Sequence, residues 1–134
     1  MKILRIEEFE SIGPKDFGNP NSYSHFEGFK IVTDKKEFVI GVSNEHNCCE
    51  SWGHISSEEN FDNFIGAEVI DYKCKDNAEY TDIELTKKNA GDCVDVYDCA
   101  FIDFNTSKGQ LQFAVYNHHN GYYGHDIKVL EKDL

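Results

Sequence analysis

The stretch CVDVYDCAFIDFNTSKGQLQFAVYN, residues 93–117, decides the fold. Its first half alternates with the two-residue period of a strand that has one buried face. One face would carry apolar side chains: Val94, Val96, Ala100, Ile102 and Phe104. The other face would carry a mixed set: Asp95, Tyr97, Phe101 and Asp103. NTSKG then supplies a turn in which Gly109 can adopt positive φ at low cost. Leu111, Phe113 and Val115 return on the apolar face, so the stretch predicts an antiparallel hairpin.

Similar signals occur on both sides of this hairpin. FEGFKIVTDKKEFVIGVSNE, residues 26–45, predicts a second hairpin that turns at DKK. Residues 67–76 and 127–130 predict further strands, because branched and aromatic side chains recur in them. Residues 11–25 contain both prolines of the chain and predict an irregular loop.

One short helix is predicted over SSEENFDNFIG, residues 56–66. Ser56 and Glu59 have the spacing of a capping box, in which two side chains satisfy free backbone N–H groups. Gly66 suits the left-handed residue that ends a helix. These elements together predict an α+β fold for a single domain, residues 1–134. We expect a strongly twisted, mainly antiparallel sheet of about six or seven strands, curled toward a barrel, with one or two short helices.

The charge and the arginine content of the chain disfavour some classes of binding partner. The chain has 134 residues and a net charge of −12, with 25 acidic residues against 13 basic ones. Arg5 is the only arginine, which disfavours direct binding to nucleic acid. No signal peptide and no run of ~18–20 apolar residues is visible. We therefore expect a cytoplasmic protein with reduced thiols and no membrane contact.

The stretch NEHNCCESWGH, residues 44–54, raises the question of a metal site. Adjacent side chains on a strand point to opposite faces, so Cys48 and Cys49 cannot easily share one ion. Three interpretations stay open: buried thiols in the core, a zinc site completed by distant ligands, and a reactive cysteine. The first is favoured, and we predict no metal ion and no cofactor.

A second cluster surrounds the turn in YNHHNGYYGHD, residues 116–126. Tyrosines can stack on a ligand and histidines can exchange protons near neutral pH. Together with the cysteine stretch, this turn is the basis of an alternative hypothesis, a small-ligand or zinc-binding domain. Its candidate residues are Cys48, Cys49, Glu50, His118, His119, Tyr122 and Tyr123.

Three motifs in this order, NCCESW, FDNFIGAEVI and VYNHHNGYYGHDI, make the chain resemble a family of small uncharacterised domains from phages and bacteria. The resemblance covers residues 28–130 and leaves the N-terminal segment outside. It implies that Cys48, Cys49, Glu50 and the turn at 120–123 form a recurring structural or binding unit, and it assigns no catalytic residue. It also implies a phage or mobile-element setting, where small acidic proteins such as anti-CRISPR proteins inhibit host defence. If a phage encodes the protein, the expected location is the host cytoplasm.

The main functional hypothesis is a non-enzymatic binding protein. Nucleophile-elbow, Walker and dinucleotide-binding motifs are all missing from the sequence. A very acidic surface can dock on the basic, nucleic-acid-binding surface of a host protein and act as a nucleic-acid mimic. The acids expected to make this contact lie in the middle of the chain: Asp76, Glu79, Asp82, Glu84, Asp92 and Asp95.

Overall fold

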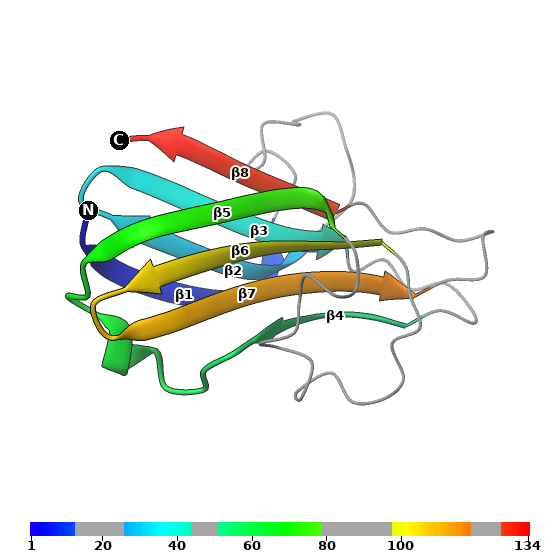
Figure 1. Ribbon diagram of the computed structural model, residues 1–134. Helices are drawn as coiled ribbons and strands as arrows, with labels where there is room; N and C mark the ends of the chain where they lie inside the picture. Colours follow the sequence, from blue (N-terminus) through cyan, green and yellow to red (C-terminus); the bar gives the residue numbers. More distant parts are fainter. Residues whose placement is uncertain (13–25, 44–50, 79–97, 119–126) are drawn as a thin grey trace.

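Two four-stranded antiparallel sheets pack face to face in the computed structural model, forming a β-sandwich (Figure 1). The structure describes residues 1–12, 26–43, 51–78, 98–118 and 127–134. The first sheet has the order β1-β2-β3-β8 and is made of β1 (Ile3–Ile12), β2 (Phe26–Thr33), β3 (Lys36–Ser43) and β8 (Ile127–Asp133). The second has the order β4-β7-β6-β5 and is made of β4 (Ser51–Ser56), β7 (Gly109–His118), β6 (Asp98–Thr106) and β5 (Val69–Ala78).

Both predicted hairpins are confirmed. In the β6–β7 hairpin, Phe104 lies opposite Leu111. At its turn, the Thr106 hydroxyl donates to the Gly109 carbonyl, and Gly109 has a φ of +118°. The turn of the β2–β3 hairpin has an equivalent hydrogen bond, in which the Thr33 hydroxyl donates to the carbonyl of Lys36. A threonine hydroxyl therefore closes each turn.

The core lies between the two sheets and is rich in aromatic rings. Phe113 from β7 meets Phe29 from β2, with ring centroids 4.8 Å apart. Phe104 and Phe38 pack edge to face at 5.1 Å. The alternation predicted for β6 holds, since Ile102 belongs to this core while Phe101 packs with Cys99 and Ala114 in a separate cluster. Burial of apolar side chains from both sheets is the main force that holds the sandwich together.

The prediction of a helix over residues 56–66 is wrong in where the helix begins and in the type of helix. Ser56 is the last residue of β4 and lies opposite Phe113 in the β4–β7 ladder. The helix present is one 3₁₀ turn, η2 (Phe61–Phe64), whose N-cap is Asn60. Sheet hydrogen bonds, which continue through Ser57 N–H to the carbonyl of Gln112, outcompete the local capping box.

The predicted class also needs correction. Neither sheet closes into a barrel, and the described residues form eight strands with one short 3₁₀ helix, which is richer in sheet than an α+β fold. The strand β1 was not predicted. In β1, Ile3 pairs with Thr33 and Arg5 pairs with Val32. Leu4 is therefore an extra residue in a β-bulge, and it breaks the two-residue period. β1 also enters the predicted loop, of which residues 13–25 lie outside the described part.

Candidate functional site

At the side of the sandwich where β1 and β4 are the edge strands, His54 of β4 links three strands. Its Nδ1 lies 2.5 Å from a carboxylate oxygen of Glu27 on β2. Its Nε2 lies 3.2 Å from a carboxylate oxygen of Glu8 on β1. The His54 ring also packs edge to face on Phe29 at 5.1 Å. One imidazole thus joins the first sheet to the edge strand of the second.

The local sequence of β4 explains this position. Because successive residues of a strand point to opposite faces, His54 points inward and its neighbours Gly53 and Ile55 point outward. A Cβ at Gly53 would lie 2.8 Å from the hydroxyl oxygen of Tyr116, so the tyrosine ring occupies the space above the glycine. This arrangement fills the gap on an edge strand that a glycine would otherwise leave.

Acidic residues are frequent on β1 and on the segment that follows β4. We call this group the acidic edge, and it consists of Glu7, Glu8, Glu10, Glu58, Glu59 and Asp62. The segment that follows β4 returns to the start of β1, where the Gly66 N–H donates to the Ile3 carbonyl at 2.8 Å. Figure 1 shows β1 and β4 on the lower side of the sandwich and β5 and β8 on the upper side.

Carboxylates outnumber cations along this edge. Arg5 pairs with Glu7 at 2.9 Å. Glu59 and Asp62 are exposed and form no ion pair with any residue in the described ranges. A negative potential over this side of the molecule follows from the excess of carboxylates.

The opposite side, along β5 and β8, holds a paired network. Lys36 Nζ lies 2.8 Å from Glu131 and 3.0 Å from Asp133, and the Tyr72 hydroxyl donates to Glu131 at 2.5 Å. The hydrogen bond from Lys36, helped by the one from Tyr72, lowers the pKa of Glu131. Cations and carboxylates offset each other here, so this side presents no comparable negative surface among the described residues.

Cys74 lies beside this network. Its thiol, with Lys75, Val129 and Glu131, lines a hollow of about 310 Å³. Burial, and then the charges of nearby carboxylates, raises the pKa of the Cys74 thiol to about 12. The thiol is therefore protonated at neutral pH and is a poor nucleophile.

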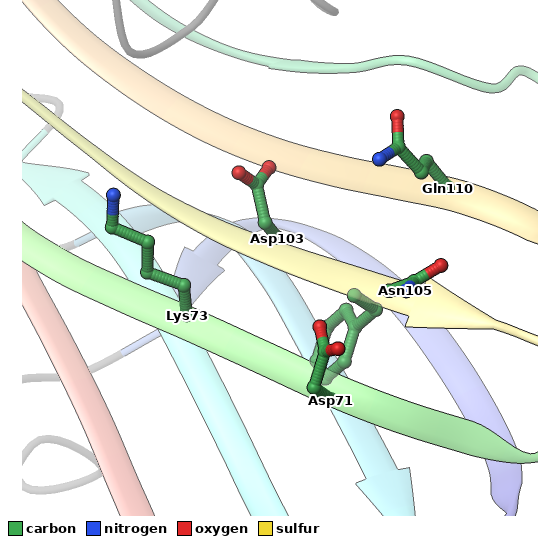
Figure 2. Close-up of a pocket in the computed structure, with 6 residues that line it drawn as sticks. Asp71, Lys73, Asp103, Asn105 and Gln110 are labelled. Carbon is green, nitrogen blue, oxygen red and sulfur yellow. The ribbon is translucent and has the colours of Figure 1, made fainter.

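A second hollow, of about 210 Å³, lies on the outer face of the second sheet (Figure 2). Its lining residues are Asp71, Lys73, Asp103, Phe104, Asn105 and Gln110. They come from adjacent strands, since Asp71 lies opposite Asn105 and Asn105 lies opposite Gln110. Lys73 Nζ lies over the ring of Phe101, 5.6 Å from its centroid. The lining can hydrogen-bond a polar group.

Most site residues predicted from the sequence lie outside the described residues. Of the predicted partner-binding acids, Asp76 lies on β5. The other five lie in residues 79–97, outside the described part of the chain: Glu79, Asp82, Glu84, Asp92 and Asp95. Of the possible ligand-binding residues, His118 ends β7, while Cys48, Cys49, Glu50, His119, Tyr122 and Tyr123 fall outside. Sequence analysis missed the acidic edge and the His54 contacts. The bulge in β1 hid the strand, and the contacts of His54 join residues 27 and 46 positions apart.

The β4–β7 ladder does relate the two predicted ligand-binding segments. Ser51, which directly follows Glu50, lies opposite His118. The Cys-Cys-Glu stretch and the late turn are therefore joined to the same end of one ladder. Within the described ranges, no group of three or more His, Cys, Asp or Glu side chains is arranged to hold a metal ion. No helix in the described part of the chain is long and apolar enough to cross a membrane.

Comparison with known proteins gives one result. Comparisons with curated proteins and with solved structures find no match. A family model, the domain of unknown function DUF7448, matches residues 2–129. The match begins well before residue 28, so the N-terminal segment that forms β1 is part of the domain, contrary to the narrower resemblance inferred from the motifs. The chain belongs to the DUF7448 family of domains of unknown function.

Proposed function

We propose that this protein is a non-enzymatic binding protein whose acidic surface docks on a basic, nucleic-acid-binding surface of a partner and blocks it. The observation that carries the proposal is the uneven charge distribution of the sandwich. The chain has a net charge of −12, and the acidic edge carries more acids than matching cations. Two lysines are engaged in ion pairs with Glu37 at 2.8 Å: Lys132, and Lys30, which lies opposite Glu7 on the neighbouring strand β2.

This distribution suits a partner with a positive groove. Complementary potentials speed diffusional encounter and select against wrong partners. The acids predicted from the sequence at positions 76–95 would add to the negative surface. The phage or mobile-element setting implied by the resemblance makes a nucleic-acid-binding defence protein of the host, such as a CRISPR effector, the first partner to test.

The test begins with capture of bacterial nucleic-acid-binding proteins on the immobilised chain, followed by purification of each captured protein. We expect its affinity for the chain to fall by about tenfold or more between about 50 and 200 mM NaCl, because screening weakens exposed charge pairs. We also expect the chain to displace a fluorescent DNA duplex from it. Binding that is insensitive to salt, or a captured protein that still binds the duplex at saturating chain, would contradict the proposal.

Two double variants locate the contact. Glu59→Gln with Asp62→Asn removes two charges from the acidic edge. Asp71→Asn with Asp133→Asn removes two charges from the opposite side and is the matched control. The edge variant should bind several-fold more weakly than the control. Equal loss in both would assign the effect to net charge and not to this side of the sandwich.

One observation favours the alternative function, a small-ligand or zinc-binding domain. The pairing of Ser51 with His118 joins the two candidate segments to one end of the β4–β7 ladder. Elemental analysis of tag-free protein, combined with a thiol count under native conditions, tests it. About one zinc ion per chain, with thiols protected until a chelator is added, would support this function. Metal-free protein whose thiols react only on unfolding would contradict a zinc site.

A further inference from the structure

We propose that His54 forms a protonation-dependent clamp between the two sheets. In its protonated form the ring holds Glu8 of β1 and Glu27 of β2 to β4, and loss of the proton releases Glu8. The clamp is a regulatory feature of the sandwich and does not depend on the proposed function. It would make one carboxylate of the acidic edge respond to pH, because Glu8 belongs to that edge.

The geometry of the His54 ring requires the second proton. A neutral imidazole has one N–H group and a protonated one has two. Nδ1 faces a carboxylate oxygen of Glu27 at 2.5 Å, and Nε2 faces one of Glu8 at 3.2 Å. A neutral ring can donate to only one of them, and its other nitrogen would then present a lone pair to a negatively charged oxygen. The protonated ring is therefore the form that keeps both contacts.

The surroundings of the ring offer no substitute for a lost contact. Among the described residues, Glu8 and Glu27 are the charged side chains within ion-pair distance of His54. On the β4–β7 ladder His54 lies opposite Val115, and its ring packs edge to face on Phe29. Both of these neighbours are apolar, so the charge of the ring decides how many carboxylates it holds.

The contact with Glu8 is the one that should break when the ring loses its proton. The side chain of Glu8 is 52% exposed, whereas that of Glu27 is 20% exposed. Water can solvate a released Glu8, but a released Glu27 would leave a carboxylate partly buried without its donor from the ring, which is unfavourable. The neutral ring should therefore keep its proton on Nδ1. β1 then loses its tie to β4, while β2 keeps its own.

Nitrogen-15 NMR of the His54 ring tests the two protonation states directly. The ring signals are assigned by their absence from the spectrum of His54→Gln. At about pH 5.5, where glutamates are ordinarily ionised and histidines ordinarily protonated, both ring nitrogens should carry a proton. At about pH 9, only Nδ1 should carry one. A neutral ring at the lower pH, or a proton on Nε2 at the higher pH, would overturn the clamp.

Hydrogen exchange of the β1 amides measures the release of this strand. Protection factors correct for the intrinsic effect of pH on exchange, and they report local opening of the strand. Between the two pH values they should fall by about two- to fivefold for residues 4–8, the range expected for loss of one exposed ion pair. The amides of residues 100–104, on β6, are the internal control and should change less. Equal changes in both strands would contradict a local release of β1.

Three variants separate the clamp from the other titrating groups. His54→Gln keeps a hydrogen-bond donor but cannot gain a proton, so it should remove the pH response of β1. Glu8→Gln removes the carboxylate that the clamp releases and should remove the response as well. Glu7→Gln is the matched control, because residue 7 points to the opposite face of the same strand, and it should respond like the parent.

A pH response of β1 that persists in Glu8→Gln, or that disappears in Glu7→Gln, refutes the clamp. If His54→Gln fails to fold, the two glutamate variants still decide between these outcomes. In that case the parent's ring signals are assigned from spectra of the other histidine variants.

Discussion

Replacing Gly28 by alanine tests how closely the strands of the first sheet approach each other. Gly28 lies on β2 opposite Gly41 of β3. A Cβ at this position would lie 1.9 Å from the carbonyl oxygen of Ile40 and 2.8 Å from the Cα of Gly41. Both are backbone atoms, so no side-chain rotation can relieve the clash. In addition, Gly28 has a φ of +158°, a backbone conformation that residues with a side chain rarely adopt.

The expected cost has two parts. An unfavourable backbone conformation costs about 1–2 kcal/mol, and overpacking that shifts a strand costs about 1–3 kcal/mol more. Gly28→Ala should therefore lower the free energy of unfolding by about 2–5 kcal/mol, out of a total that is about 5–15 kcal/mol for an ordinary domain. Gly66 is the matched control, because its φ is +84° but no atom lies within 4 Å of its Cβ position. Gly66→Ala should cost only the first part, about 1–2 kcal/mol.

Urea unfolding followed by circular dichroism measures both variants, and an unchanged m-value would show that the transition stays comparable. The difference between the variants isolates the steric part. We expect Gly28→Ala to be less stable than Gly66→Ala by about 1 kcal/mol or more. If Gly28→Ala is as stable as the control, the close approach of β2 and β3 at this position is refuted.

Three further predictions follow from the core and the β5–β8 side. Phe113→Ala should cost about 3–5 kcal/mol in urea unfolding, since the ring is fully buried and contacts three others, and a loss under ~1.5 kcal/mol would contradict this. The Cys74 thiol, with a pKa of about 12, should react with iodoacetamide far more slowly in native than in unfolded protein, and equal rates would exclude its burial. Because the pKa of Glu131 is lowered in the folded protein, its ionised carboxylate stabilises the fold at pH values above the ordinary pKa of 4.5. This contribution is lost as the pH falls through the folded pKa. Stability should therefore fall less on acidification in Glu131→Gln than in the parent, and identical acid profiles would refute the pairing with Lys36.

The sequence alone determined the elements whose signals are local. The two-residue period of residues 99–104 and 111–115 identified which side chains enter the core. The polar turn DKK and the turn NTSKG with Gly109 identified both hairpins, because strands joined by a short turn pair with each other at little entropic cost. The acidic composition is likewise a property of the sequence, and the proposal of a basic partner starts from it because opposite charges attract.

Only the tertiary structure decided the features that join distant residues. Val129 of β8 pairs with Ile40 of β3, and Glu8 meets His54 across the two sheets. No local pattern encodes such pairings, because they depend on which apolar faces can be buried together once the chain has closed long loops. Ser56 illustrates the competition directly: its spacing to Glu59 favours a helix cap, yet pairing with β7 extends the sheet instead. The acidic edge is likewise a product of folding, since it assembles carboxylates from β1 and from the segment after β4 on one side of the sandwich.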